Sequence, residues 1–136
     1  MIEMKLRRRG KGIRQKLKLF VSGRARAVAQ EAVASTLLEL IDEGFDNRSD
    51  PYGFSWAPHV IPVDHEILED TRALREGFYS VVLGNEVSIQ NAVGYAGVHQ
   101  AGSARIPRRA MLPYGPLPAP WSERIDQNVA FALKLL

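Results

Sequence analysis

The 136-residue sequence contains no cysteine. Disulfide bonds, thiol catalysis and cysteine–zinc sites are therefore all excluded. The sequence also lacks long hydrophobic runs, so no segment is predicted to cross a membrane. The N-terminus is basic and has no apolar core of a secretory signal, so we expect no export by that route and assembly in the cytoplasm. With 46% hydrophobic and 24% charged residues, the composition is that of an ordinary globular domain.

The common motifs of enzymes are missing as well. The sequence has no Gly-x-Ser-x-Gly or Ser-x-x-Lys nucleophile motif, and no glycine pattern of a phosphate loop or a dinucleotide site. A pair of carboxylates that meets only in the folded chain stays open, but the acidic run at 64–70 is typical of a solvated face. We therefore predict a non-enzymatic protein with no catalytic residues and no cofactor.

Three histidines invite a metal-site interpretation together with the acidic residues at 64–69. These are His59, His65 and His99. No pair of them has a zinc-ligand spacing such as His-Glu-x-x-His, so no metal site is predicted. We interpret His59 and His65 as loop residues, and His99 as a buried or half-buried residue bonded to backbone.

Positive charge is concentrated at the N-terminus. Residues 1–18 carry eight Lys/Arg and one Glu, whereas the remainder carries ten Lys/Arg and fourteen Asp/Glu, so a net +7 precedes a net −4. We predict a basic flexible arm at 1–12 and a single domain at 13–136. Such an arm suits nucleic acid or an acidic protein face, and the alternative is a charged end that merely stays solvated. Its candidate binding residues are Arg7, Arg8, Arg9 and Lys11.

The clearest predicted element is a helix over 24–43. Apolar residues recur at steps of three and four along it, alanine is frequent and proline is absent. We expect Gly44 to end this helix and Phe45 to fold back onto its apolar stripe. A C-terminal helix is predicted to begin at Ser122 as its N-cap. Shorter helices are predicted at 13–21, 65–70 and 91–100.

Strand signals are concentrated at 74–89. This stretch is rich in β-branched and aromatic residues and is interrupted by Gly84-Asn85, which predicts a β-hairpin. A short strand edge is predicted at 110–112. In the loop that follows the long helix, Phe54 and Trp56 alternate with a serine, so we expect both rings to anchor the loop in an apolar pocket.

We interpret the segment at 95–113 as a docking element. His99 and Gln100 can fix neighbouring backbone, and three arginines beyond them supply positive charge. These arginines, Arg105, Arg108 and Arg109, fit either DNA phosphates or acidic groups on a neighbouring copy. We favour the second partner, because no aromatic residues are interleaved with the arginines and the rest of the chain is net acidic.

Four motifs in order resemble the phage virion-morphogenesis, or tail-completion, proteins, the family of the Mu-like tail protein. The first is the aromatic, Asp-Pro-x-Gly and Trp-x-Pro loop at 45–58, and the second is the Leu-x-x-Thr segment at 67–74. The third and fourth are Tyr-Ala-x-x-His-Gln-x-Gly at 95–102 and Ile-Pro-x-Arg-x-Met-Leu at 106–112. The sequence departs from the family at two positions: Arg72 replaces a glycine, and Met111 replaces an aromatic residue.

The resemblance covers 13–136 and implies an α+β fold: a long N-terminal helix packed on a small, mostly antiparallel β-sheet, with a short helix and a C-terminal helix. It also implies a homo-oligomeric ring, a hexamer, at the head–tail junction or tail end of a virion. The implied partners are the tail tube, sheath or head–tail connector proteins, with no membrane. Interface candidates are Trp56, His99, Gln100, Arg105, Arg108 and Arg109. The alternative function is a nucleic-acid-binding module that uses the basic arm.

Overall fold

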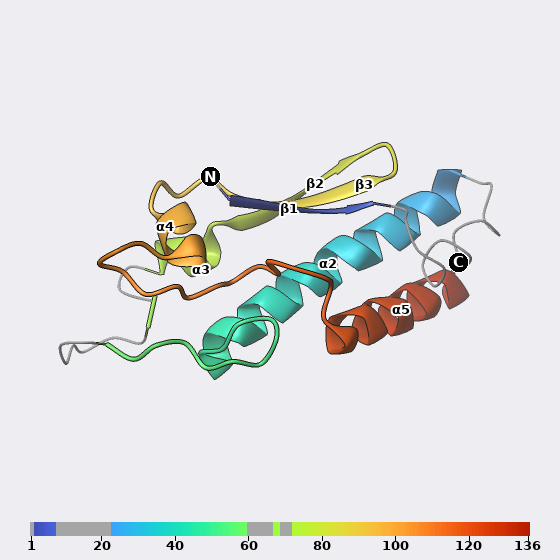
Figure 1. Cartoon of the computed structure of the whole chain (residues 1–136). Helices are drawn as coiled ribbons and strands as arrows, with labels where there is room; N and C mark the ends of the chain where they lie inside the picture. The colour runs from blue at the N-terminus through green and yellow to red at the C-terminus, as the bar shows by residue number, and fades with distance from the viewer. Residues whose placement is uncertain (1, 8–22, 60–66, 69–71) are drawn as a thin grey trace.

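The computed structural model describes residues 2–7, 23–59, 67–68 and 72–136. They form an α+β fold in which helix α2 (Gly23–Asn47) lies between a small sheet and helix α5 (Ala119–Lys134) (Figure 1). This arrangement confirms the predicted fold class. The core lies on both sides of α2, where apolar side chains of the sheet, α2 and α5 are buried together.

The sheet is three-stranded and antiparallel, with the order β1-β3-β2. Its strands are β1 (Ile2–Arg7), β2 (Phe78–Leu83) and β3 (Glu86–Asn91). The predicted hairpin is confirmed as β2 and β3. Gly84, with φ 59°, occupies the first position of the connecting turn, where a type II′ turn requires glycine.

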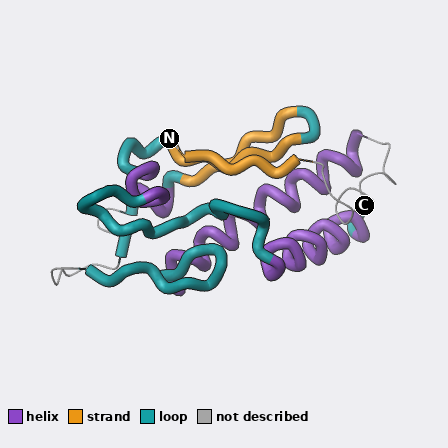
Figure 2. Tube along the Cα trace, viewed as in Figure 1, coloured by secondary structure: helices purple, strands orange, loops and turns teal. Residues whose placement is uncertain are grey.

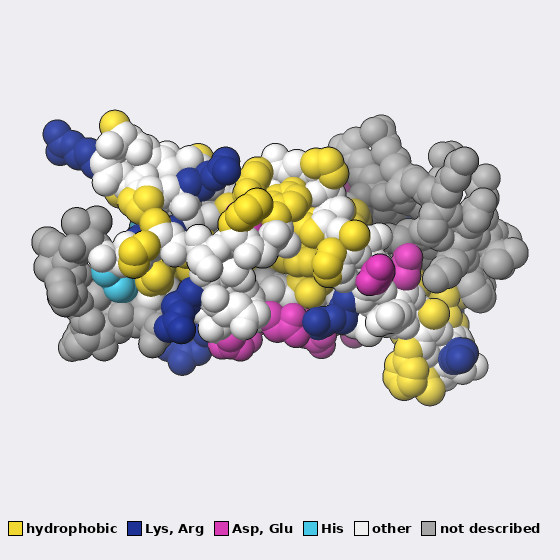
Figure 3. All heavy atoms as spheres, turned by 60° about the horizontal axis from the view of Figure 1, so that its bottom comes forward, with side chains coloured by type: hydrophobic (Ala, Val, Ile, Leu, Met, Phe, Trp, Pro, Cys, Tyr) yellow, Lys and Arg dark blue, Asp and Glu magenta, His cyan; other side chains and the backbone are white. Residues whose placement is uncertain are grey.

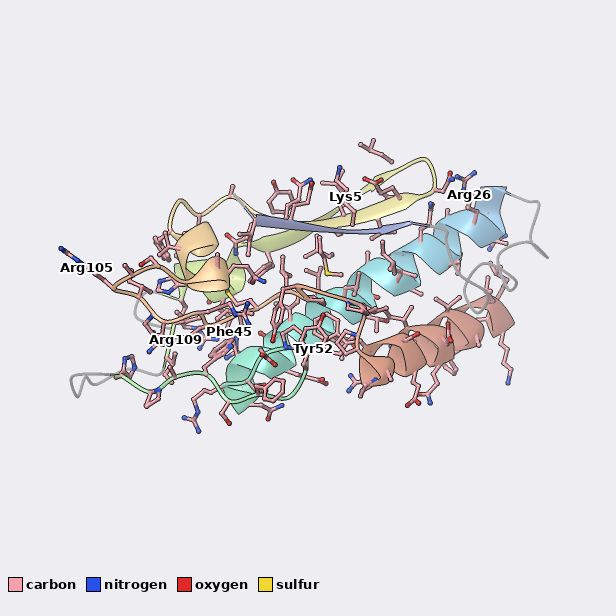
Figure 4. All side chains as sticks on the ribbon, viewed as in Figure 1. Lys5, Arg26, Phe45, Tyr52, Arg105 and Arg109 are labelled. Atoms are coloured by element: carbon pink, nitrogen blue, oxygen red, sulfur yellow. The ribbon has the colours of Figure 1, made fainter. Side chains whose placement is uncertain are left out.

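The expectation of a flexible basic arm at 1–12 is wrong for residues 2–7, which form strand β1. Ile2, Met4 and Leu6 alternate with charged residues, and their apolar side chains pack against the core beneath the sheet. Lys5 points away from the helices on the outer face (Figure 4). Arg7 ends β1 opposite Glu86. The other arm residues, Arg8, Arg9 and Lys11, lie outside the described residues.

Helix α2 confirms the helix predicted at 24–43, but it continues through Gly44 to Asn47. Packing explains the extra turn, because Phe45 is 1% exposed and stacks edge-on against Trp56, with ring centroids 5.2 Å apart. Arg75 then covers the acidic end of the helix by contacting Asp42 at 2.7 Å and Asp46 at 2.6 Å.

Helix α5 begins at Ala119 rather than at Ser122. Pro118 is its N-cap residue and Pro120 lies in its first turn, where a missing backbone N–H costs nothing. The backbone N–H of Ser122 already donates to Pro118 O at 3.0 Å, so Ser122 is inside the helix.

Two short helices complete the described chain, α3 (Ala73–Glu76) and α4 (Ala96–Ala101). Leu74, predicted as part of a strand, is instead buried in α3. Helix α4 is shorter than the predicted helix at 91–100, because Asn91 still belongs to β3 and uses its side chain to bind Leu74 O at 2.7 Å.

The predicted helices at 13–21 and 65–70 lie outside the described residues, apart from a turn at 67–68. Across the part of the chain that the structure describes, no helix combines the length and apolar character needed to cross a membrane.

Candidate docking surface

Two long loops lie side by side near the C-terminal end of α2, one at 48–58 and one at 102–118 (Figure 2). Trp56 joins them, since its Nε1 donates to Ala110 O at 2.9 Å. Arg109 joins them again: its Nε donates to Ala57 O at 2.8 Å and one terminal nitrogen donates to Pro58 O at 3.0 Å. Both side chains are buried, so they hold the loops together from the inside.

Gln100 fixes the second loop against α4. Its Nε2 donates to Leu112 O at 2.7 Å, and its Oε1 accepts the backbone N–H groups of Met111 at 2.8 Å and Leu112 at 3.0 Å. The side-chain amide therefore satisfies the backbone that was predicted to pair as a strand edge at 110–112. That strand prediction is wrong, because Gln100 takes the place of a neighbouring strand.

A tight turn at Gly102, after α4, brings Arg108 and Arg109 back against α4. Gly102 has φ 77° and ψ 172°, and a Cβ there would lie 2.9 Å from the backbone nitrogen of Arg108. Beyond the turn, the Arg109 N–H donates to His99 O at 2.8 Å. Only glycine allows the backbone at 102 to come this close to Arg108. The close contact explains why the Tyr-Ala-x-x-His-Gln-x-Gly motif ends in glycine.

His99 is half-buried and faces Tyr95 edge-on at 5.9 Å. Its Nδ1 is buried and has no hydrogen-bond partner among the described residues, so the predicted bond from this side chain to backbone is not seen there. Burial lowers the pKa of His99, and the nearby Arg109 guanidinium lowers it further. The imidazole is therefore held in its neutral form beside a buried cation.

An aromatic pair forms the outer side of the two loops. The rings of Tyr52 and Tyr114 lie 4.8 Å apart, and the Tyr114 hydroxyl donates to Asp50 Oδ2 at 3.0 Å. The Tyr52 hydroxyl donates to Pro116 O and accepts the Gly115 N–H, each at 2.8 Å. Both tyrosines remain partly exposed while their hydroxyl groups are fixed.

Sequence reasoning did not include either tyrosine among the candidate site residues. The Asp50-Pro-Tyr-Gly turn was the available signal, since an aspartate at the start of such a turn binds backbone two residues on. Asp50 Oδ1 indeed accepts the N–H of Tyr52 at 2.8 Å and of Phe54 at 3.0 Å. Phe54, expected to anchor the loop, is 69% exposed, and Trp56 alone is the anchor.

We define the docking surface as the half-buried Tyr52 together with four exposed residues of these loops: Phe54, Arg105, Arg108 and Tyr114. The Arg108 guanidinium lies 4.1 Å from the centre of the Tyr114 ring, a cation–π contact. Arg105 extends away from the body at the tip of its loop (Figure 4). The surface therefore combines aromatic rings with long arginine side chains, and both residue types are enriched at protein interfaces.

A hollow of about 490 Å³ adjoins the docking surface between α2 and the start of α5. Leu40, Met111 and Trp121 line it together with Tyr52, and an ion pair between Arg124 and Glu43 at 2.9 Å lies beside them. In the space-filling view, hydrophobic side chains gather in the middle of this face, with Lys, Arg, Asp and Glu side chains around them (Figure 3). Apolar area with a charged rim is typical of an interaction site.

The structure separates the six interface candidates of this region into two groups. Trp56 and Arg109 are buried, and Gln100 is committed to backbone, so these three shape the surface and do not themselves offer a contact. Arg105 and Arg108 are exposed. His99 lies between the two groups, half-buried under the turn.

Arg72 keeps an unusual backbone conformation, with φ 61° and ψ 2°. This left-handed conformation favours glycine, and non-glycine residues adopt it at a cost. The backbone of Arg72 is therefore held in a conformation that a glycine would adopt without strain.

The described residues contain no group of three or more His, Asp or Glu side chains that could hold a metal ion. Comparison with known proteins gives no match: neither a family model, nor a curated protein, nor a solved structure is similar to the chain. The described residues thus present an aromatic and cationic surface next to a hollow.

Proposed function

We propose that this chain is a structural assembly protein of a phage or prophage-derived virion, a tail-completion or tail-terminator subunit that forms a ring at the head–tail junction. The observation that carries the proposal is the left-handed backbone of Arg72, which has φ 61°. The family motif has glycine there, and a motif that matched by chance has no reason to place its glycine position in the region that glycine favours.

A second observation supports the proposal. Three of the four motifs that carry the resemblance form a single bonded unit: Trp56 binds the backbone of Ala110, Gln100 binds Leu112, and Arg109 binds Ala57. Motif residues that bind each other's backbone define the shape of a surface. They are poorly placed for chemistry on a substrate, because their polar atoms are already used.

In this proposal the docking surface contacts a neighbouring copy or a tail protein. Arg105 and Arg108 supply its positive charge, and acidic side chains lie near the C-terminal end of α2. Asp42 and Asp46 there each form an ion pair with Arg75 inside the chain, and their side chains are still 60% and 63% exposed. A ring requires two different patches that meet head to tail, and opposite charges on separate parts of one chain satisfy that requirement. The tail tube, sheath or connector would occupy the faces of the ring.

The test is the mass of the full-length protein by light scattering, combined with negative-stain electron microscopy. We expect closed rings in the wild type, and their loss in the double variant Arg105→Glu, Arg108→Glu. The matched control is Arg24→Glu, an exposed arginine outside the docking surface. Rings that persist in the double variant would contradict the role given to the two arginines, and a protein that never assembles at any concentration would contradict the proposal itself.

A further inference from the structure

Strand β2 is an edge strand of the described sheet. Among the described residues it pairs only with β3, on one side. Its residues, Phe-Tyr-Ser-Val-Val-Leu, include no charge and no proline, and its register with β3 has no bulge. Three of its apolar residues are widely exposed: Tyr79 at 42%, Val82 at 43% and Leu83 at 72%. Exposed edges of this kind recruit another strand unless something blocks them.

The other edge strand of the same sheet provides an internal comparison. On the outer face of β1, Glu3 and Lys5 carry charge, and Lys5 contacts Glu3 at 3.5 Å and Glu86 at 3.4 Å. Charged side chains are the usual protection of an edge strand. Because the same sheet has a charged edge and an uncharged edge, the lack of charge on β2 is specific to that strand.

The free backbone groups of β2 can be assigned from the hairpin. In a hairpin closed by two residues, the flanking pair Leu83 and Glu86 exchanges both hydrogen bonds, and the bonded pairs then alternate along the ladder. The N–H and C=O groups of Ser80 and Val82 therefore point outward, away from β3. Within the described part of the chain no strand occupies them, so they can bind a further antiparallel strand.

The position of this edge is fixed by contacts from α2 to the hairpin turn. Arg26 donates to Asn85 Oδ1 at 2.8 Å, and Gln30 donates to Gly84 O at 2.6 Å. Figure 4 shows Arg26 at the end of α2 that lies under the turn. A pre-positioned strand loses little conformational freedom on pairing, which favours association.

We propose that β2 pairs antiparallel with β2 of a second copy, about a two-fold axis at Val81, so that two sheets become one. In this register Val81 faces Val81 of the second copy, and Tyr79 faces Leu83 of the second copy on the same outer face. Ser80 and Val82 of one copy exchange hydrogen bonds with Val82 and Ser80 of the other. The most exposed apolar side chains of the strand thus cover each other.

The choice of a second copy follows from charge and symmetry. Self-pairing of β2 brings no charged side chain opposite another, whereas β1 as the partner would place Glu3 and Lys5 against apolar residues. A two-fold contact uses the same patch on both copies and closes at two. It is therefore independent of the head-to-tail contacts that a ring needs, and it does not depend on the proposed function.

One strand pair is a small interface compared with the roughly 800 Å² per partner of a standard stable complex. We therefore expect a dimer that depends on concentration and not a permanent one. Sedimentation velocity over a wide concentration range should show exchange between monomer and dimer, or between a ring and its paired form.

The absence of cysteine makes a cross-linking test direct, because any introduced thiol is unique. In Val81→Cys the two thiols would face each other in a pair that shares no hydrogen bonds, where Cα atoms are about 4.5 Å apart, within the range that a disulfide accepts. Lys5→Cys is the matched control, because Val81 and Lys5 flank the same residue, Ser88, on the outer face. We expect a covalent dimer from Val81→Cys under mild oxidation and none from Lys5→Cys.

A second variant tests the contact without oxidation. Val81→Glu places two carboxylates opposite each other across the two-fold axis, while within one copy it lies in the same row as Lys5. We expect pairing to weaken by about tenfold or more, because like charges directly opposite each other repel, while the circular dichroism spectrum stays unchanged.

Two results would overturn the pairing: equal cross-linking of both cysteine variants, or a mass distribution that Val81→Glu leaves unchanged. A ring that survives Val81→Glu would overturn only this inference and leave the proposed function standing.

Discussion

Gln100 and Leu112 exchange two hydrogen bonds, as two residues do on neighbouring strands. Gln100 Nε2 donates to Leu112 O at 2.7 Å, and the Leu112 N–H donates to Gln100 Oε1 at 3.0 Å. A side-chain amide thus replaces a peptide group of a strand. Together with the backbone bond from the Arg109 N–H to His99 O, this side chain holds the segment that carries the arginines to α4, so the shape of the docking surface depends on it.

Replacement of Gln100 by leucine should destabilise the protein strongly. The variant keeps apolar volume but leaves the backbone groups of Met111 and Leu112 without partners, at about 1–3 kcal/mol for each buried group left unpaired. Because three backbone groups lose their partner, we expect the free energy of unfolding, measured with urea, to fall by about 3 kcal/mol or more. Gln127→Leu, at an exposed position of α5, is the control and should change it by less than about 0.5 kcal/mol. Equal effects at the two positions would contradict the role of Gln100.

Substitution of Arg109 should destabilise the protein more than substitution of its neighbour Arg108. Arg109 is 8% exposed and binds Ala57 O and Pro58 O, so Arg109→Met should cost about 1.5–3 kcal/mol of stability. Arg108→Met removes an exposed contact with Tyr114 and should cost less than about 1 kcal/mol. Urea unfolding of both variants tests this. If Arg108→Met were the more destabilising, our division into buried framework and exposed surface would be wrong.

Gly102 should tolerate no side chain. Its φ of 77° and ψ of 172° lie in a region essentially limited to glycine, and a Cβ would come within 2.9 Å of Arg108 N. We expect Gly102→Ala to lower the unfolding free energy by about 1–3 kcal/mol. Gly94→Ala is the matched control, because a Cβ there meets open space and φ is not positive. Unchanged stability in Gly102→Ala would show that the turn can rearrange freely.

Replacement of Arg72 by glycine should destabilise the protein less than replacement by any other residue. Its left-handed backbone, φ 61°, is strained for a side chain, and its ion pair with Glu76 at 3.5 Å is exposed. Arg72→Gly should leave stability unchanged or raise it by up to about 1 kcal/mol, since relief of strain offsets the entropy of glycine. Arg72→Val should lower it by about 1 kcal/mol or more, because a branched side chain fits this region worst. Thermal unfolding of the two variants compares them, and a large loss in Arg72→Gly would remove the observation that carries the proposed function.

The predictable parts of the fold were those with a strong local pattern. The apolar stripe of α2 and the Gly84-Asn85 turn of the hairpin are set by neighbouring residues. Strand β1 was missed although Ile2, Met4 and Leu6 alternate with charge, because the dense positive charge favoured a solvated arm. Its burial depends on β3, which follows far along the chain, and such a partner is invisible in a local pattern.

The candidate site was predictable in position but not in the role of each residue. The signature at 95–102 and the arginines beyond it do lie together with the Trp56 loop. Only the folded chain shows that Arg109 turns inward while Arg108 turns outward, because two adjacent arginines look alike in a sequence. The helix start at Ala119 was missed for a similar reason: Pro118 and Pro120 indicate extended chain, yet proline also suits a first helical turn.

His99 should make the stability of the protein depend on pH just below neutrality. Burial and Arg109 lower the pKa of His99 in the folded state, whereas in the unfolded chain it is about 6.5. Between these two values the unfolded chain binds more protons, so stability falls as pH falls through about 6.5 and stops falling below the folded pKa.

The variant His99→Phe tests this pH dependence, because it keeps a ring facing Tyr95 and cannot titrate. Urea unfolding of both proteins from pH 8 to pH 5 should therefore show a steeper loss in the wild type, while His59 and His65, present in both, cancel from the difference. Parallel pH profiles would mean that His99 is protonated as easily in the folded protein as in the unfolded chain, and that its unpartnered Nδ1 is not held away from solvent.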